Sequence, residues 1–323
     1  MRRLNVLLLP IHRLYSPWCD DVKAAIGGHH NLKELDDDQP MAPQFAGIDV
    51  VIDQGGSRGT PEMMDAATDC KFWQVLGTGF DHFPLTYIKQ KGIPAGNTPG
   101  LFSAISLAET AMMYMIMLSR KYKESVHNFH EGLLYHPLGF ELPGKTVGIV
   151  GFGASGRELA VRAKAFGMRV MGIDVRQIEQ DVLATIQPDF MGTPDDLDRV
   201  VEECDYLSLH LHLNEETHHI IDARRLALMK PTASVINVAR GALVDEDALY
   251  QALADGTIGG AGLDVFAEEP PDLSQPVYQL PNVIVTPHIA GVTDGTSRRR
   301  AACTAENTDR IAQGLEPLYR IDQ

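Results

Sequence analysis

Short runs of apolar and β-branched residues alternate with helix-length segments along the whole chain. In the first third of the sequence, the apolar runs predict strands at Leu4–Leu9, Ile48–Ile52, Phe72–Leu76 and Ile93–Ala95. The segments between them predict helices at Asp20–Ile26, Pro61–Ala67 and Pro84–Lys91. Alternation of this kind is typical of a parallel sheet that is covered by helices on both faces.

A methionine-rich segment, Ser103–Arg120, predicts one continuous helix, whose methionines we expect to be buried in packing. The alternation then restarts and predicts strands at Thr146–Val150, Arg169–Ile173, Tyr206–Leu211, Ser234–Val238, Gly262–Val265 and Val283–Val285. A final helix is predicted over Thr293–Gly314. The pattern therefore predicts two parallel-sheet domains, one made of residues 106–292 and the other of residues 1–105 together with residues 293–323.

The length and the charge of the chain narrow the classes of function. Its 323 residues are enough for about two domains, each with its own core. The 28 basic and 43 acidic side chains give a net charge of −15, which repels nucleic-acid phosphate and anionic membranes. No stretch of roughly 18 apolar residues occurs, so no membrane-spanning helix is expected. We therefore expect no nucleic-acid partner and no membrane partner.

The cysteines and the N-terminus indicate a reducing compartment, and we expect a cytoplasmic protein. The four cysteines are scattered, without the spacing of a zinc site or a disulfide framework. Arg2 and Arg3 before an apolar run resemble the start of a secretory leader. The run is only about seven residues long, however, and no small-residue cleavage site follows it. We therefore expect that run to be the first strand.

A glycine motif of the form G-x-G-x-x-G follows the first strand predicted in the second half and precedes a helix-forming stretch. In that setting Gly151 permits a tight turn, Gly153 lets a pyrophosphate approach the backbone, and Gly156 lets helix and strand pack closely. The amides of Ala154 and Ser155 would face the phosphates at the positive end of the helix. The motif predicts a dinucleotide-binding domain.

The end of the next predicted strand bears on the choice of cofactor. Asp174 follows that strand, and a carboxylate at this place accepts hydrogen bonds from the adenosine ribose and repels a 2′-phosphate. We therefore expect NAD. Arg176 leaves NADP open as an alternative, because its charge would tolerate the additional phosphate. A second alternative is that Asp174 only caps a turn.

Three residues in the second half of the chain could supply a cation for a substrate carboxylate, an acid that protonates an oxygen, and a carboxylate that supports that acid. Arg240 follows a predicted strand, and its planar guanidinium suits bidentate binding of a carboxylate. His288 follows another strand, and imidazole both donates and accepts a proton near neutral pH. Glu269, with Glu268 as its competitor, is the carboxylate that would favour the protonated imidazole. Taken alone, an arginine or a histidine at such a place is more often a surface or structural residue.

Sequence blocks in a fixed order give the chain a resemblance to a known family. In chain order they are Gly77-Thr78-Gly79-Phe80-Asp81, Asn97-Thr98-Pro99-Gly100, Leu107-Ala108-Glu109, the glycine motif, Met229-Lys230-Pro231, Asn237-Val238-Ala239-Arg240-Gly241-Ala242-Leu243-Val244-Asp245, Leu263-Asp264-Val265-Phe266, Glu268-Glu269-Pro270 and Thr286-Pro287-His288-Ile289. With these blocks the chain resembles the NAD-dependent D-2-hydroxyacid dehydrogenases over nearly its whole length. The resemblance implies an α/β fold of two doubly wound parallel-sheet domains, with a Rossmann cofactor domain inserted into a flavodoxin-like substrate domain.

The resemblance also implies roles for individual residues. The family's catalytic residues fall on Arg240, Glu269 and His288, with His288 and Glu269 as the acid–base pair. Contacts to the nicotinamide half of the cofactor fall on Val238, Ala239, Asp264 and Gly291. Contacts to the substrate carboxylate fall on Leu76, Gly77 and Thr78. The loop Gln54–Arg58 is expected to face the substrate and to set specificity.

The chain departs from the family pattern at two places. The family usually has proline or a small residue where this chain has His212, to which no cofactor contact is assigned. A tryptophan that is common in the family is absent from Glu131–Pro143, beside the long helix through which the family forms homodimers. A homodimer remains the expectation. We interpret His127, His130 and His136 as a solvated or interfacial helix end, and we expect no metal.

The sequence therefore predicts an enzyme that transfers a hydride between NAD(H) and a small 2-keto or 2-hydroxy acid, in a cleft between two domains. Glyoxylate or hydroxypyruvate is the expected substrate, because small polar residues and glycines dominate the loop Gln54–Thr60. The family's phosphoglycerate branch is disfavoured, because it often carries an additional regulatory domain. The alternative from another class is a non-enzymatic NAD(H)-sensing interaction module, similar to the family's transcriptional corepressors. The intact catalytic trio argues against a scaffold that has lost catalysis.

Overall fold

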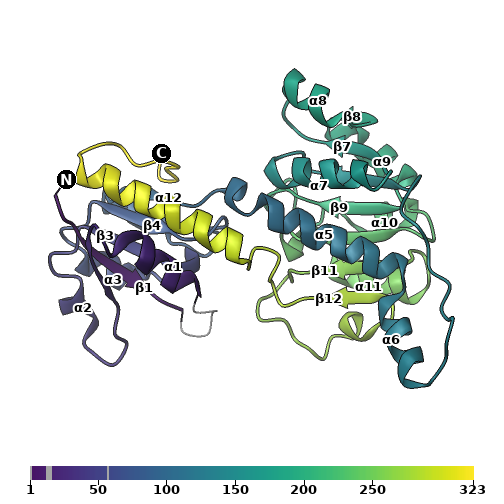
Figure 1. Cartoon of the computed structure of the whole chain (residues 1–323), viewed down its shortest axis with the longest axis horizontal. Helices are drawn as coiled ribbons and strands as arrows, with labels where there is room; N and C mark the ends of the chain where they lie inside the picture. The colour runs from purple at the N-terminus through teal and green to yellow at the C-terminus, as the bar shows by residue number, and fades with distance from the viewer. Residues whose placement is uncertain (1, 12–16, 57) are drawn as a thin grey trace. The chain divides into compact units, whose positions relative to one another are not determined.

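Two α/β units, each built on its own parallel sheet, make up the chain (Figure 1). The computed structural model describes residues 2–11, 17–56 and 58–323. Unit 1 consists of Met1–Ser103 and Thr293–Gln323, and unit 2 consists of Ala104–Val292. Unit 1 is thus formed by both ends of the chain, and unit 2 is inserted between them in sequence.

Unit 1 contains a five-stranded sheet with the strand order β2-β1-β3-β4-β5. Its strands are β1 (Asn5–Leu9), β2 (Asn31–Glu34), β3 (Val50–Asp53), β4 (Phe72–Val75) and β5 (Ala95–Gly96). All pairings are parallel, and this order is that of flavodoxin-like folds. Its helices are α1 (Pro17–Ile26), α2 (Met41–Gln44), α3 (Pro61–Ala66), α4 (Leu85–Gln90) and α12 (Asp294–Ala312).

Residue alternation along the strands gives this sheet two apolar faces. Val6 and Leu8 of β1 lie in one core cluster, together with residues of α1 and α12. Leu7 and Leu9 lie in the other, together with residues of α3 and α4. Because both faces are covered, the strand reads as a continuous apolar run in the sequence. The C-terminal helix α12 packs against α1 and therefore completes unit 1.

Unit 2 contains a seven-stranded parallel sheet with the order β12-β11-β10-β9-β6-β7-β8. Its strands are β6 (Thr146–Val150), β7 (Arg169–Ile173), β8 (Phe190–Gly192), β9 (Tyr206–Leu209), β10 (Ser234–Asn237), β11 (Gly260–Leu263) and β12 (Val283–Val285). Its helices are α5 (Ala104–Ser119), α6 (Tyr122–His130), α7 (Ala154–Ala165), α8 (Gln180–Ile186), α9 (Leu197–Glu203), α10 (Ala223–Leu228) and α11 (Glu246–Ala254).

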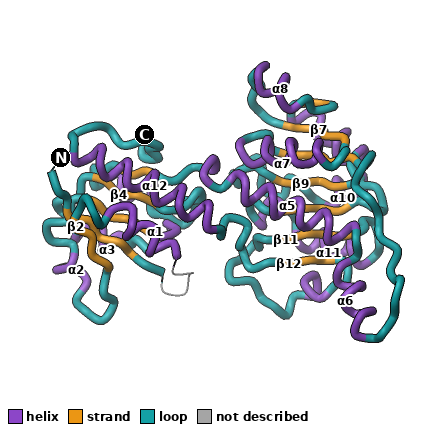
Figure 2. The backbone as a smooth tube through the Cα atoms, in the orientation of Figure 1, coloured by secondary structure: helices purple, strands orange, loops and turns teal. Residues whose placement is uncertain are grey.

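The helices of unit 2 cover both faces of its sheet (Figure 2). One core cluster contains residues of α5 and α7, and the other contains residues of α9, α10 and α11. The strand order reverses between β6 and β9, which are neighbours in the sheet although two strands separate them in sequence. Ligands of such sheets bind outside the carboxyl ends of the strands at this reversal.

The structure corrects several sequence predictions. The sequence predicted neither β2 nor β8, because β2 is a polar edge strand with exposed residues and β8 has only three residues. The predicted helix Ser103–Arg120 is confirmed as α5, and the separate helix α6 begins after Lys121, whose φ of 48° lies between the two helices. Met112 and Met115 are buried as predicted, but Met113 is exposed, so that prediction was wrong for Met113. No helix of the described residues is long and apolar enough to cross a bilayer.

Candidate active site

The glycine motif forms the turn between β6 and α7. Gly151 has a φ of 96°, and a Cβ there would lie 2.6 Å from the carbonyl oxygen of His210. A Cβ on Gly156 would lie 2.1 Å from the carbonyl oxygen of Gly151. A side chain at either position would collide with backbone, so glycine is required for both the turn and the close packing of α7.

The N-terminus of α7 fits the pyrophosphate of a dinucleotide. The helix begins at Ala154, and its N-cap residue Gly153 has no side chain to accept hydrogen bonds from the first turn. Backbone amides at such a helix start are donors at the positive end of the helix dipole. Gly153 also leaves the space above the turn without a Cβ. The residues present therefore fit the phosphates of NAD.

Asp174 follows β7 and is buried, and hydrogen-bond donors surround its carboxylate. Its carboxylate accepts hydrogen bonds from the Phe152 amide at 2.9 Å and from the Arg176 amide at 2.9 Å. Arg176 Nε and Nη2 also donate to it, at 3.0 and 3.1 Å. Burial alone would raise the pKa of Asp174, but Arg176 and the two amides hold it below its ordinary value. Arg176 is thus bound to the carboxylate that would meet the ribose.

His210 is a residue of this site that the sequence reasoning missed. It follows β9, and its Nδ1 lies 3.0 Å from Ser155 Oγ while its Nε2 lies 2.9 Å from Ser208 Oγ. Burial lowers the pKa of His210 to about 3, so the imidazole is neutral and one ring nitrogen donates while the other accepts. His210 therefore holds Ser155 of the glycine motif. Its place after a strand beside β6 was the signal that could have revealed it.

Arg240 stands in the turn that follows β10. Asn237 shapes this turn, because its Nδ2 donates to the Arg240 carbonyl at 2.8 Å and its Oδ1 accepts from the Ala239 amide at 3.1 Å. Arg240 Nη1 donates to the Ala239 carbonyl at 2.7 Å. A Cβ on Gly241 would lie 1.9 Å from the Phe266 carbonyl carbon, so the turn packs closely on the next loop.

His288 and Glu269 meet although they lie on separate loops. His288 Nδ1 donates to Glu269 Oε2 at 2.7 Å. The two side chains are half-exposed, which leaves the imidazole accessible to a ligand. Because Nδ1 is bound to the carboxylate, Nε2 is the ring atom available for proton exchange.

Asp264 is fully buried after β11 and holds the turn that carries His288. Its carboxylate accepts hydrogen bonds from the Ile289 amide at 2.8 Å and from the Ala290 amide at 2.7 Å. It also accepts from the hydroxyl of Thr286, which in turn contacts the hydroxyl of Tyr114. The sequence reasoning gave Asp264 only a cofactor contact, and the structure adds this supporting role.

Within unit 2, the charges of His288 and Arg240 both act on the carboxylate of Glu269. Partial burial would raise the pKa of Glu269. The hydrogen bond and charge of His288, the Phe266 amide and the charge of Arg240 outweigh this effect and hold that pKa below its ordinary value. Glu269 is therefore ionised at neutral pH. The arrangement combines a cation, a hydrogen-bonded imidazole and a carboxylate that stabilises the protonated imidazole.

The loop predicted to bind the substrate carboxylate belongs to unit 1. The Leu76 amide donates to the Asp53 carbonyl at 2.8 Å, and the Gly77 carbonyl accepts from the Thr98 amide at 3.1 Å. The Thr78 carbonyl accepts from Asn97 Nδ2 at 2.8 Å. Position 57, within the predicted specificity loop, lies outside the described residues.

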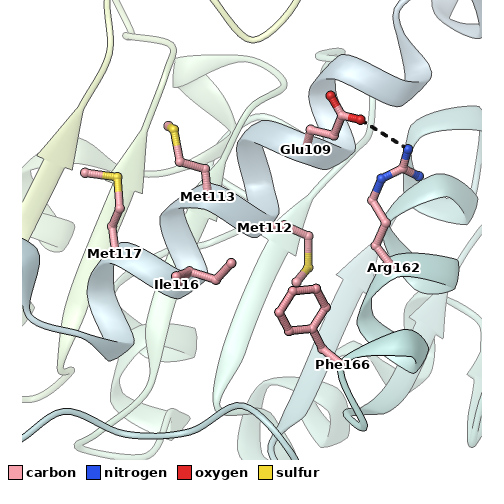
Figure 3. Close-up of a pocket in the computed structure, with 7 residues that line it drawn as sticks. All are labelled: Glu109, Met112, Met113, Ile116, Met117, Arg162 and Phe166. Carbon is pink, nitrogen blue, oxygen red and sulfur yellow. Dashed lines mark hydrogen bonds and ion pairs between the residues drawn. The ribbon is translucent and has the colours of Figure 1, made fainter.

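Other surface features do not belong to this site. An open apolar groove of about 420 Å³ lies between α5 and α7. Figure 3 shows its lining side chains, which are Glu109, Met112, Met113, Ile116, Met117, Arg162 and Phe166. None of these is a predicted site residue. Within the described ranges, no three His, Cys, Asp or Glu side chains are grouped so that they could hold a metal ion.

Comparison with known proteins agrees with this geometry. Residues 112–290 match the family model described as D-isomer specific 2-hydroxyacid dehydrogenase, NAD binding domain. The chain is 37% identical over 256 residues to a hydroxypyruvate reductase of Thermotoga maritima, covering 78% of this chain and 81% of the relative. It is 35% identical over 278 residues to a D-3-phosphoglycerate dehydrogenase of Methanocaldococcus jannaschii, covering 85% of this chain and 52% of the relative.

A solved structure extends the likeness to the whole chain. The D-lactate dehydrogenase of Aquifex aeolicus, solved in complex with NAD and lactic acid, has a TM-score of 0.81 to this chain at 28% sequence identity. The match covers 99% of both chains.

Proposed function

Since the chain belongs to the family of D-isomer-specific 2-hydroxyacid dehydrogenases, it transfers a hydride between NAD(H) and a 2-hydroxy or 2-keto acid, and we propose that Arg240, Glu269 and His288 are its catalytic residues. The observation that carries the proposal is the 2.7 Å hydrogen bond between His288 Nδ1 and Glu269 Oε2. The charge of Arg240 acts on the same carboxylate.

Each of the three residues has its own role in the reduction. Arg240 binds the carboxylate of the keto acid through its planar guanidinium. His288 gives the proton on Nε2 to the ketone oxygen, and Glu269 stabilises the protonated imidazole before that transfer. Bound NADH supplies the hydride. In the direction of hydroxyacid oxidation, His288 accepts the proton.

We assign the cofactor-binding residues as part of the same proposal. Gly151, Gly153, Ala154, Ser155 and Gly156 bind the pyrophosphate, as the open start of α7 supports. Asp174 binds the adenosine ribose, and its ionised state disfavours a 2′-phosphate there. The engagement of Arg176 by Asp174 supports NAD over NADP. Contacts to the nicotinamide half are assigned to Val238, Ala239, Asp264 and Gly291.

The substrate is a small 2-keto acid. We assign its carboxylate to the loop of Leu76, Gly77 and Thr78 as well as to Arg240, because hydrogen bonds from Thr98 and Asn97 hold that loop in place. Hydroxypyruvate is the first candidate, because the Thermotoga maritima relative is a hydroxypyruvate reductase.

A panel of keto acids tests the proposal. NADH oxidation is followed with glyoxylate, pyruvate and hydroxypyruvate, for the unmodified protein and for His288→Ala. We expect turnover that falls by at least about 100-fold in the variant, because general acid catalysis is lost. His29→Ala, which alters an exposed histidine after α1, should retain full activity. Tight NADH binding without turnover of any acid would instead favour an NAD(H)-sensing module.

We also propose that the protein forms a homodimer. Large apolar side chains are exposed along α5, α6 and the segment after α6, namely Ile105, Met113, Ile116, Tyr122, Val126, Phe129, Leu133, Leu134, Tyr135, Leu138 and Phe140. Apolar patches of this extent mark interaction surfaces in folded proteins. The family homodimer expected from the sequence would cover the same segments.

A further inference from the structure

Buried polar atoms without a hydrogen-bond partner gather in one part of unit 1. In the part of the chain that the structure describes, they are Gln54 Nε2, Arg58 Nε, Thr98 Oγ1 and Arg300 Nε. Gln54 and Arg58 follow β3 and Thr98 follows β5, so these three lie at the carboxyl edge of the sheet. Ligands of open α/β sheets bind at that edge. Since buried polar groups normally have partners, this set indicates a ligand site.

Arg300 of α12 brings a buried positive charge to this edge. The residue is only 6% exposed. Its Nη2 donates to Thr78 Oγ1 at 3.2 Å, in the loop after β4, and its Cζ lies 5.1 Å from the centre of the Trp18 ring. Burial, and then the neighbouring charge of Arg299, lowers the pKa of Arg300 to about 10, so it remains charged at neutral pH.

No carboxylate of the described residues forms an ion pair with Arg300, in contrast to two other polar side chains of the C-terminal segment. Asn307 of the same helix donates to Gln74 Oε1 at 2.8 Å and accepts from the Leu318 amide at 2.7 Å. Arg320 is paired with Asp322. Arg300 is buried and charged without such a partner, whereas a buried charge is normally kept where an anion compensates it.

We propose that Arg300 is a specificity-determining residue, which binds a second anionic group, a carboxylate or a phosphate, on the 2-keto acid. The inference rests on the proposed function, because the Thr78 that Arg300 contacts belongs to the loop assigned to the substrate. A guanidinium suits this task, since it binds oxyanions through paired N–H groups. Thr98 Oγ1 is an unused hydroxyl next to the same loop, because the Thr98 amide donates to the Gly77 carbonyl.

Holding Thr78 in place would not by itself require a charge. A neutral donor could make the same hydrogen bond to Thr78 Oγ1 without the burial of a cation beside Arg299. A doubly anionic substrate also accounts for the buried positive charge of Arg300, beside Arg299, in a chain with a net charge of −15.

Matched substrate pairs test the inference. Pyruvate is compared with oxaloacetate, which adds a carboxylate, and hydroxypyruvate with its 3-phosphate, which adds a phosphate. We expect kcat/KM to be at least about 10-fold higher for the doubly anionic member of one pair, and that pair identifies the group bound. In Arg300→Met this preference should vanish through a higher KM for the doubly anionic acid, with a smaller loss of kcat/KM for the singly anionic acids, because the hydrogen bond to Thr78 Oγ1 is lost for both. Arg300→Lys should recover part of the preference.

The outcomes separate this inference from the proposed function. Reduction of keto acids without any preference for a second anion would overturn the role of Arg300 alone. Equal losses for both members of each pair in Arg300→Met, with no recovery in Arg300→Lys, would show a structural role and would also overturn it. If no acid is reduced and His288→Ala matches the unmodified protein, both proposals fail. Thermal unfolding of each variant shows whether a loss reflects misfolding.

Discussion

At the scale of single residues, the orientation of His288 depends on groups from separate segments. The residue has a φ of 54°, a left-handed conformation that is unfavourable for a residue with a Cβ. Asp264 holds the turn through the amides of Ile289 and Ala290, and Glu269 holds the ring through Nδ1. The backbone and the side chain of His288 are thus fixed independently, which leaves Nε2 in a defined position.

Glu269→Gln tests the electrostatic half of this arrangement. The amide keeps an acceptor for Nδ1 but removes the negative charge that stabilises the protonated imidazole. We expect kcat/KM for reduction to fall about 10- to 100-fold. NADH oxidation measures this effect. Glu268→Gln is the matched control and should leave kcat/KM unchanged. The pairing is contradicted if both variants behave alike.

His210 makes the stability of the folded protein depend on pH. Burial lowers the pKa of His210 from 6.5 to about 3, so the folded protein does not take up the proton that the unfolded chain binds. The stability from His210 is therefore fully present above pH 6.5 and is lost as the pH falls toward 3. The loss is about 1.4 kcal/mol for each pH unit in that window.

His210→Gln should flatten this dependence, because glutamine has no proton to gain. Urea unfolding at pH 7, 6 and 5 gives the free energy of unfolding at each pH. His29→Gln, at an exposed histidine, should keep the slope of the unmodified protein. Equal slopes for His210→Gln and the unmodified protein would mean that His210 is protonated in the folded state.

At the scale of elements, the sequence predicted the strands whose residues are buried, because burial gives a strand its apolar pattern. Strands such as β6 and β9 are buried on both faces, so their apolar runs were visible in the sequence. In contrast, β2 lies at the edge of its sheet and carries polar, exposed residues, and it has no such pattern. The sequence predicted α5 to within one residue at each end, and Lys121, with its positive φ, separates α5 from α6.

The same distinction holds for the site. Arg240, Glu269 and His288 were predicted because each follows a strand or stands in a family block, and their chemistry is specific. His210 and Arg300 were missed because their roles depend on burial and on partners distant in sequence. A sequence shows that a histidine or an arginine is present, but a missing counter-charge is visible only in three dimensions.

The turn between β6 and α7 allows a test at this scale. Gly156→Ala would place a Cβ 2.1 Å from the Gly151 carbonyl oxygen, so α7 must shift away from the strand. We expect a weaker affinity for NADH, by about 10-fold or more, and a destabilisation of about 1–3 kcal/mol. Fluorescence titration and urea unfolding measure the two effects. Gly28→Ala, where a Cβ meets nothing within 4 Å, is the control. Normal NADH affinity in Gly156→Ala would show that this packing is not needed for binding.

At the scale of the whole molecule, the net negative charge contrasts with positive charge at particular sites. The net charge of −15 repels an anionic keto acid at long range, so binding must depend on local cations. Many arginines are neutralised by partners, as Arg176 is by Asp174 and Arg298 is by Asp294. Arg300 has no carboxylate partner among the described residues, so its charge is available to attract an anion.

The exposed apolar side chains of α6 and the following segment predict the assembly state. Phe129 is 73% exposed and Leu134 is 66% exposed, so neither contributes much to the folding of a single chain. If a second copy covers them, Phe129→Glu combined with Leu134→Glu should bury charges in the interface and dissociate the dimer. Sedimentation should then give 35.5 kDa instead of twice that mass, with the midpoint of urea unfolding little changed at low protein concentration. Leu273→Glu, at a leucine that is also 73% exposed but lies outside these segments, should remain dimeric. A monomeric unmodified protein, or a dimer that survives both charges, would place the interface elsewhere or remove it.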